Sequence, residues 1–322
     1  MTTKKYKFNY NDLNITIENN IINENWDFLD KSYKYVIITD TNVASTYKKI
    51  LNEVPNGIAI LSLKPGVNIK TLNSYEKVIK NFITLGVTKN DILIAFGGNY
   101  VQNLSCFIAS TYLNGIKLIQ IPTTIYSQIN SGIIGNNTLY VNNLPIIGTN
   151  YLAENIIIDP SFIKSLSDTE LQKGIIEIIK LGIIKDNEIL SNITDNKIDN
   201  NDSHYIHHIE KCLDINYNLS SKKEYIKKEP SILNFGELYY DLISNLSKGK
   251  LSSAEIKAIS MYFEIKQNLR EKLLKIYEVY FDINILQNYI NLFTKNIEKN
   301  TLESNIEIIK LGHAKIIKNK VE

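Results

Sequence analysis

Short, almost continuously apolar runs alternate with segments of helical periodicity through the first half of this sequence. The apolar runs are residues 33–40, 57–63, 91–98 and 116–122. The segments with helical spacing of apolar residues are 41–54, 71–86 and 100–115. Strands that are apolar on both faces and alternate with helices are typical of a parallel sheet covered on both sides. We therefore predict a Rossmann-like α/β domain built from right-handed βαβ units.

The pattern changes near residue 160. The run "NIIIDP" (155–160) ends at Asp159-Pro160, and almost all of the remaining chain is helical in period. The clearest helical segments are 168–184, 204–219, 252–277 and 284–297. The sequence thus predicts two domains. An α/β N-terminal Rossmann-like domain with a parallel sheet covers residues 1–160, and an all-α C-terminal domain covers residues 161–322.

Charge and cysteine content exclude some classes of protein. The formal net charge is +2 and basic residues form no block, which argues against a nucleic-acid-binding protein. Cys106 and Cys212 lie far apart inside apolar segments, so we expect two reduced, buried thiols in a cytoplasmic protein. The N-terminus has no apolar segment and no apolar run is long enough for a membrane span, so we expect neither secretion nor membrane association.

Two neighbouring stretches are candidates for binding a nucleotide. "IAFGGNYVQN" (94–103) is a strand, a double glycine and a helix start, and the helix N-terminus favours an anion such as a pyrophosphate. Gly97 and Gly98 would let backbone amides approach the ligand, although the full GxGxxG pattern is absent. Thr123 and Thr124 follow the next strand at its carboxyl end, where open α/β sheets bind ligands. Tight turns without a ligand are the alternative interpretation.

Three further stretches carry charged or metal-binding side chains. "HYIHH" (204–208) spaces His204 and His208 like a metal pair, but it adjoins a polar loop, which favours a solvent-exposed helix start. Glu177 and Lys180 share one face of a very apolar helix, as an internal ion pair or as a site. "ILNFGELYYD" (232–241) resembles a helix start that carries two carboxylates.

The sequence resembles the 3-dehydroquinate synthase family of sugar-phosphate cyclases over nearly its whole length. The resemblance is carried by "ASTYLNGIKLIQIPTT", by "IIIDPSFIKSLSDTELQKGIIEIIKLGII", and by "LNFG" followed by "AISM". It implies an NAD-binding α/β domain, a helical metal-binding domain and a dimer. It also implies that NAD oxidises the substrate alcohol transiently, after which phosphate is eliminated, the ketone is reduced and the ring closes.

The resemblance assigns cofactor contacts residue by residue. The implied NAD-binding residues are Asp40, Asn42, Lys70, Gly97, Gly98, Thr123, Thr124, Phe162, Ser165, Leu166 and Glu170. The sequence departs from the family at Val67, at Asn99 in place of a third glycine, and at Asn103 in place of an acidic residue. We therefore expect an NAD site of weakened affinity.

The resemblance also implies that most of the metal and substrate chemistry has been replaced. The family's zinc is held by one Glu and two His, which correspond here to Glu177, Glu237 and Ser253, and a supporting histidine corresponds to Asp241. We do not expect zinc on two carboxylates and a serine, whereas a harder ion such as Mg²⁺ on Glu177, Glu237 and Asp241 is an open alternative. Lys180 and Asn234 remain of the catalytic set. Five cationic positions of the family correspond to Asn114, Asn136, Leu144, Asn216 and Pro230, and an asparagine of the family corresponds to Pro145.

Three functions follow as hypotheses. The first is a pseudoenzyme, retained to bind a nucleotide or a partner, as a homodimer or as a heterodimer with an active paralogue. The second is a divergent NAD-dependent cyclase, dehydrogenase or lyase with Glu177, Lys180, Glu237 and Asp241 as its acid–base set. The third is an active 3-dehydroquinate synthase of the shikimate pathway.

Overall fold

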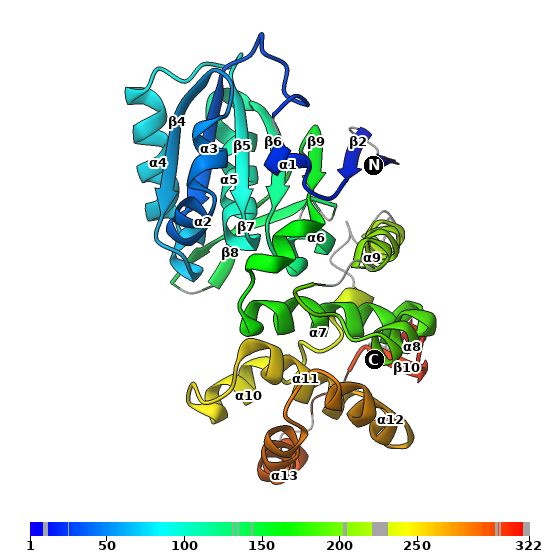
Figure 1. Ribbon diagram of the computed structural model, residues 1–322. Helices are drawn as coiled ribbons and strands as arrows, with labels where there is room; N and C mark the ends of the chain where they lie inside the picture. Colours follow the sequence, from blue (N-terminus) through cyan, green and yellow to red (C-terminus); the bar gives the residue numbers. More distant parts are fainter. Residues whose placement is uncertain are drawn as a thin grey trace. The chain divides into compact units, whose positions relative to one another are not determined.

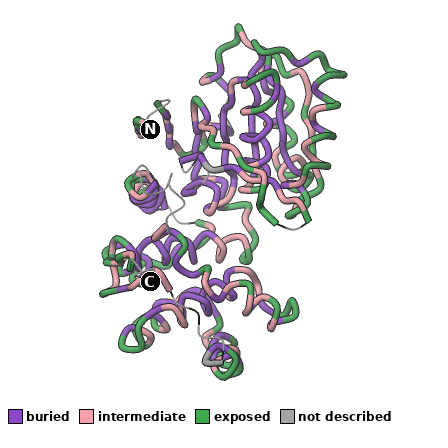
Figure 2. Tube along the Cα trace, turned by 180° about the vertical axis from the view of Figure 1, so that it is seen from behind, coloured by how far each residue is buried: buried purple, intermediate pink, exposed green. Residues whose placement is uncertain are grey.

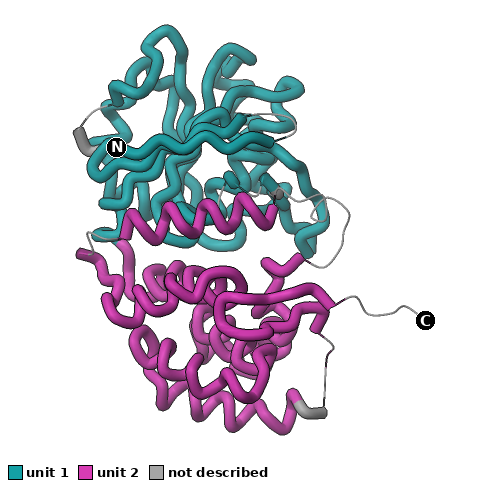
Figure 3. Tube along the Cα trace, turned by 90° about the vertical axis from the view of Figure 1, so that its right-hand side faces the viewer, with its two compact units in different colours: residues 1–165 teal, residues 166–322 magenta. Residues whose placement is uncertain are grey.

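The computed structural model describes residues 1–8, 12–24, 26–130, 132–133, 135–142, 144–201, 205–220, 231–299, 302 and 304–317. These residues form two compact units, Met1–Ser165 and Leu166–Glu322, coloured separately in Figure 3. The division falls shortly after residue 160, where the sequence pattern changes. No helix in the described ranges is long and apolar enough to cross a membrane.

The first unit is built on a seven-stranded sheet in the order β1-β2-β9-β6-β5-β3-β4 (Figure 1). All neighbouring pairs are parallel except β1 with β2, so the predicted parallel α/β fold is confirmed. The strands of this sheet are β1 (Thr2–Lys7), β2 (Asp12–Ile17), β3 (Tyr35–Asp40), β4 (Gly57–Leu63), β5 (Ile92–Gly97), β6 (Lys117–Pro122) and β9 (Asn155–Ile158). The helices of the unit are α1 (Ile21–Glu24), α2 (Thr41–Thr46), α3 (Lys48–Asn52), η1 (Val67–Lys70), α4 (Leu72–Thr84), α5 (Asn99–Thr111), η2 (Tyr112–Asn114), α6 (Ile125–Asn130) and η3 (Pro160–Ser165).

Strands β3 and β5 are buried along their whole length because apolar groups cover both faces of the sheet (Figure 2). On one face, Ile37, Ile94 and Phe96 pack with Leu51 of α3 and with Trp26. On the other face lies α5, whose residues Val101–Ala109 are buried at all but one position. This central helix begins at the carboxyl end of β5, so its N-terminus lies at the edge where a nucleotide was expected.

Two hairpins of the first unit were not predicted from the sequence. Strands β1 and β2 pair antiparallel in full register, and β7 (Asn136–Val141) pairs with β8 (Leu144–Asn150) as a separate two-stranded sheet. Strand β8 is mostly exposed, and β1 alternates between exposed and less exposed residues. Strands of this kind are held by their partner's hydrogen bonds, and they show no apolar pattern that sequence inspection could detect.

In its described residues the second unit is helical apart from one hairpin, so the predicted all-α domain is wrong at residues 306–316. Its helices are α7 (Asp168–Lys185), α8 (Asn187–Asp195), α9 (Tyr205–Ser220), η5 (Ile232–Asn234), α10 (Tyr240–Ser247), α11 (Ser253–Glu264), α12 (Gln267–Glu278) and α13 (Ile283–Lys299). Ser252 opens α11 with a capping box, since its hydroxyl accepts from the Glu255 amide and the Glu255 carboxylate accepts from the Ser252 amide. Helix α7 is buried without interruption from Gly174 to Ile184.

The hairpin of the second unit, β10 (Ile306–Lys310) with β11 (His313–Ile316), is fastened to the end of α7. The Gly312 amide donates to the Ile183 carbonyl over 2.8 Å. Gly312 has φ +83°, and a Cβ there would lie 2.6 Å from the backbone nitrogen of Asn187. The close approach therefore requires glycine on two separate grounds.

Replacing Gly312 by Ala is expected to lower the free energy of unfolding by about 2–4 kcal/mol, because left-handed strain adds to a clash with backbone that cannot rotate away. Urea denaturation followed by far-UV circular dichroism measures the loss. Gly249→Ala is the matched control, since Gly249 has φ +77° but open space around its Cβ position. Equal losses in the two variants would contradict the described docking of the hairpin.

Candidate functional site

The glycine turn lies between β5 and α5 at the carboxyl edge of the sheet. Gly97 packs against the helix so closely that a Cβ would lie 2.8 Å from Val101 Cγ2. Gly98 is the N-cap residue of α5 and supplies no side-chain cap. The first amides of a helix are left without intrahelical partners and carry a partial positive charge. The turn therefore fits the pyrophosphate of a dinucleotide such as NAD.

The two threonines lie beside this turn. The Thr123 amide donates to the Gly97 carbonyl over 3.1 Å, which ties the end of β6 to the end of β5. Thr124 faces Gly98, where a Cβ would lie 3.4 Å from its methyl group. Thr124 also caps α6 through Ser127, whose amide donates to the Thr124 hydroxyl. The structure thus brings Gly97, Gly98, Thr123 and Thr124 together, as the sequence predicted.

Asp40 and Asn42 lie at the end of β3, the strand next to β5. The Asp40 carboxylate caps α2 by accepting from the amides of Asn42 and Val43, over 2.9 and 3.0 Å. In the structure Asp40 therefore acts as the N-cap of α2. Asn42 is exposed at the same end of β3.

Lys70 is buried at the end of η1, which packs against α5. Its ammonium lies 5.1 Å from the centroid of the Tyr140 ring and 3.5 Å from the Thr138 hydroxyl. Among the described residues, no carboxylate lies within ion-pair distance of it. Burial lowers the pKa of Lys70 to about 8, since desolvation disfavours the charged form.

The remaining residues implied for the cofactor are divided between the two units. In the first, Phe162 is a core residue that packs edge-on against Tyr47 and Phe96, and Ser165 accepts from the Tyr47 hydroxyl over 2.8 Å. In the second, the Leu166 carbonyl accepts from Asn200 Nδ2, and Glu170 pairs with Lys173.

A charged cluster lies in the second unit, and its centre is the ion pair between Glu177 and Lys180 of α7. Both side chains are buried, and the Lys180 ammonium also donates to the Leu233 carbonyl over 3.2 Å. Burial lowers the pKa of Lys180, and the neighbouring Glu177 carboxylate opposes that effect. The pair expected from the i, i+3 spacing is present.

A second lysine pairs with the second candidate ligand. Lys257 of α11 is buried and its ammonium contacts the Glu237 carboxylate, which is about half exposed. Glu237 precedes α10, which begins only at Tyr240, so the predicted helix start at this carboxylate is wrong. Gly236 has φ +87°, and this turn ends the short η5 before a helix can continue. Asn234 and Asp241 are both exposed.

Sequence inspection missed Glu264, which fastens the same turn. Its carboxylate accepts from the amides of Gly236 and Leu238 and from the Ser260 hydroxyl, over 3.1, 3.0 and 3.2 Å. Burial raises the pKa of Glu264 to about 7. The available signal was an acidic residue inside the apolar segment "SMYFEI" (260–265), and buried charges need partners.

The side chains present do not fit a resident metal ion. Within the described ranges, no three His, Cys, Asp or Glu side chains come together as metal coordination requires. The Lys257 ammonium contacts Glu237, which corresponds to a metal-ligating histidine of the family, and this positive charge would oppose a divalent cation. Ser253 is the first residue of α11.

The histidine-rich stretch needs a correction. His208 is buried rather than exposed, because α9 places Tyr205, His208, Ile209 and Cys212 on its inner face at helical spacing. His207 is exposed, whereas His204 lies outside the described residues, as does Pro230.

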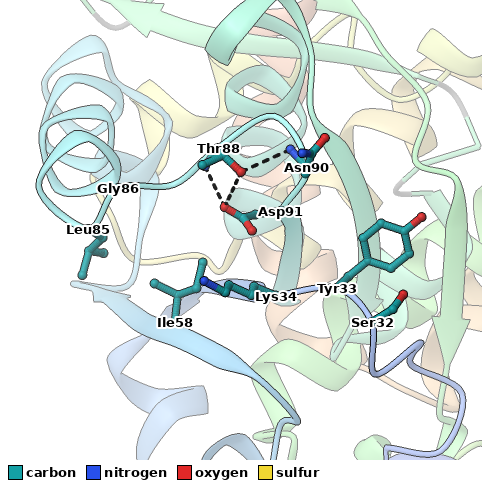
Figure 4. Close-up of a pocket in the computed structure, with 9 residues that line it drawn as sticks. All are labelled: Ser32, Tyr33, Lys34, Ile58, Leu85, Gly86, Thr88, Asn90 and Asp91. Atoms are coloured by element: carbon teal, nitrogen blue, oxygen red, sulfur yellow. Dashed lines mark hydrogen bonds between the residues drawn. The ribbon is translucent and has the colours of Figure 1, made fainter.

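A surface pocket of about 330 Å³ lies elsewhere, at the amino ends of β3, β4 and β5 (Figure 4). Lys34, Ile58 and Asp91 are among its lining residues, and Asp91 accepts from the amide and hydroxyl of Thr88. None of the described lining residues belongs to the predicted site, which lies at the opposite edge of the sheet.

Comparison with known proteins agrees with this geometry. Residues 60–173 match the family model described as 3-dehydroquinate synthase N-terminal. A 3-dehydroquinate synthase of Clostridium kluyveri is 34% identical over 272 residues, covering 80% of this chain and 74% of that protein. One from Clostridium botulinum is 28% identical over 329 residues, covering 92% and 91%.

Solved structures share the whole fold. 2-Deoxy-scyllo-inosose synthase complexed with carbaglucose-6-phosphate, NAD⁺ and Co²⁺ has a TM-score of 0.79 at 17% identity, covering 98% of this chain and 95% of that one. ValA, a 2-epi-5-epi-valiolone synthase from Streptomyces hygroscopicus with NAD⁺ and Zn²⁺ bound, has a TM-score of 0.79 at 14% identity, covering 99% and 94%. The fold is therefore that of the sugar-phosphate cyclases. Within that class, the chain belongs to the 3-dehydroquinate synthase family.

Proposed function

We propose that this chain binds an NAD-type nucleotide through its first unit and does not catalyse the family's cyclisation of 3-deoxy-D-arabino-heptulosonate 7-phosphate. One observation carries the proposal: Glu237, which corresponds to a metal-ligating histidine of the family, is paired with Lys257. The Lys257 ammonium at this carboxylate would repel a divalent ion, and the family's other histidine corresponds to Ser253, which does not suit zinc. The described side chains therefore form no site for a metal ion that would assist the cyclisation.

The nucleotide half of the proposal rests on the glycine turn. The N-terminus of α5, with Gly98 as its N-cap, presents backbone amides that suit a pyrophosphate. Two proteins of the same fold have NAD⁺ bound. Bound NAD would supply hydride transfer, whereas this chain's own groups would hold and orient it.

The role we propose is that of a pseudoenzyme in the cytoplasm, acting as a homodimer or as a heterodimer with an active paralogue. Two free, buried thiols, Cys106 and Cys212, suit a reducing compartment. The substrate of the family carries a phosphate and a carboxylate, which need cationic partners in a desolvated site. Asn216, which corresponds to one such cation, is an uncharged residue buried in α9.

Phosphate release from 3-deoxy-D-arabino-heptulosonate 7-phosphate tests the proposal. The purified chain receives NAD and, in turn, Zn²⁺, Co²⁺, Mn²⁺ and Mg²⁺, and NAD binding is measured separately by calorimetry. We expect binding of NAD without phosphate release above a heat-inactivated control. Steady release with any of these metals would overturn the pseudoenzyme, and absence of NAD binding would overturn the nucleotide half.

An active enzyme is the second candidate. The 34% identity to a 3-dehydroquinate synthase favours it, and so does Lys180, a buried amine of lowered pKa beside a carboxylate. Such a pair suits acid–base chemistry on an NAD-oxidised substrate. NADH formation in a screen of uncharged polyols, abolished in Lys180→Met, would support a divergent dehydrogenase or cyclase. Phosphate release in the assay above would support the family's own reaction.

A further inference from the structure

One glutamine of α5 holds the carboxyl ends of β5 and β6 together. Gln102 is fully buried, and its Nε2 donates to the carbonyls of Ala95, Gly97 and Ile121 over 3.0, 2.9 and 3.1 Å. Ala95 and Gly97 belong to β5, whereas Ile121 belongs to β6. The two N–H bonds of one amide are thus shared among three carbonyls on two neighbouring strands.

These carbonyls belong to the edge that carries the glycine turn. The Gly97 carbonyl accepts from Gln102 and also from the Thr123 amide. Gly98 and Thr124 are the next residues along each chain segment, and they face each other. The Gln102 amide therefore lies where the spacing between the glycine turn and the threonine pair is set.

The position of Gln102 in the turn is also informative. In the dinucleotide-binding pattern GxGxxG, the last glycine allows close packing of the helix on the strand. When that pattern is placed on Gly97, its last position is Gln102. In this chain the side chain of Gln102 occupies the space that the pattern leaves empty by placing glycine there.

The other end of the same side chain has no compensating contact. Gln102 Oε1 is buried and has no hydrogen-bond partner among the described residues. An unpaired buried acceptor destabilises a fold. Stabilisation of the fold alone therefore does not account for a glutamine at this position. The favourable contacts are the hydrogen bonds donated by Nε2 beside the glycine turn.

We propose that Gln102 is a positioning residue of the nucleotide site. Its amide donors fix the ends of β5 and β6 so that Gly97, Gly98, Thr123 and Thr124 present one preformed surface to the ligand. The expected effect of Gln102 on NAD affinity rests on the proposed function, whereas its effect on the ends of the two strands does not require a nucleotide.

Gln102→Met tests the proposal, because it keeps the length and burial of the side chain and removes both donors. The affinity for NAD, measured by calorimetry well below the melting temperature, is expected to fall about tenfold. Native-state hydrogen exchange of the Thr123 amide is expected to become at least about tenfold faster. The amides of Leu93 and Leu118, at the amino ends of the same strands, should keep their protection.

Ser105→Ala is the matched control. Ser105 lies on the same buried helix, and its hydroxyl has no hydrogen-bond partner among the described residues. This variant should leave both the NAD affinity and the Thr123 exchange unchanged. Should Gln102→Met fail to fold, Gln102→Ala takes its place with the same expected result.

The outcomes separate the two claims. A purely structural Gln102 would lower the melting temperature and leave the NAD affinity and the relative exchange of Thr123 unchanged, which would overturn the proposal. If the unmodified chain does not bind NAD, the nucleotide proposal fails. Faster exchange confined to Thr123 would then still support the positioning of the edge by Gln102, and unchanged exchange would overturn it.

Discussion

Replacing Glu177 by Gln is expected to lower the free energy of unfolding by about 3–5 kcal/mol, which is the range for breaking a buried ion pair from one side. The side chains of Glu177 and Lys180 are only 6% and 7% exposed. The substitution leaves the Lys180 ammonium in a low-dielectric site without its carboxylate, although the Leu233 carbonyl still accepts from it. Urea denaturation followed by far-UV circular dichroism gives the change.

Two variants control for this result. Glu170 and Lys173 have the same i, i+3 spacing on the same helix but are 40% and 36% exposed, so Glu170→Gln should change the stability by less than about 1 kcal/mol. The double variant Glu177→Leu with Lys180→Met should recover most of the loss, because apolar side chains replace both charges. Equal losses in Glu177→Gln and Glu170→Gln would show that burial does not decide the effect.

Replacing Lys70 by Met is expected to remove a rise in stability that the parent protein shows above pH 8. The folded pKa of Lys70 is lowered to about 8 by burial, so at higher pH the folded state binds fewer protons than the unfolded state does. Stability from this group therefore increases as the pH rises from 8 toward the ordinary lysine value, by about 3 kcal/mol in total. Stability measured from pH 7 to 10.5, as a difference between parent and variant, isolates the contribution of Lys70.

Lys64→Met is the control, since it removes one positive charge from an exposed position shortly before Lys70 in the sequence. Its difference from the parent reports the effect of net charge alone. The free energy of unfolding of the parent minus that of Lys70→Met should rise between pH 8 and 10.5. If it does not rise, Lys70 is solvated in the folded protein and the described burial is wrong.

Strands β3, β5 and β6 could be predicted because each is a run of apolar residues that is buried on both faces of the sheet. Strand β4 lies at the edge of the sheet and has no buried residue, so only its apolar run indicated a strand. The strands β1 and β8 could not be predicted, since polar and exposed side chains leave no periodic signal. The stretch 232–241 resembled a helix start, but α10 begins only at Tyr240, after the turn at Gly236. A left-handed glycine can end a helix regardless of the hydrophobic pattern around it.

The candidate site likewise contains residues whose positions could be predicted from the sequence and others whose positions could not. Gly97, Gly98, Thr123 and Thr124 could be placed together because the carboxyl ends of neighbouring parallel strands meet at one edge. Lys257 could not be paired with Glu237, because the two are twenty residues apart and separated by α10. His208 was placed at the surface because of the polar loop before it, whereas the inner face of α9 decides its burial.

Side chains far away in the sequence hold the turn at residues 233–239 in addition to its own backbone hydrogen bonds, and this has a consequence for the order of folding. One of these hydrogen bonds comes from Lys180, which lies 53 residues before Leu233. The others involve Lys257, Ser260 and Glu264, which lie 20 to 28 residues beyond their partners. Such contacts form only after α7 and α11 have both formed and docked, since closing the intervening loops is unfavourable until then. Substitutions at Glu264 should therefore accelerate unfolding far more than they slow refolding, and this turn should be among the last parts of the helical unit to order.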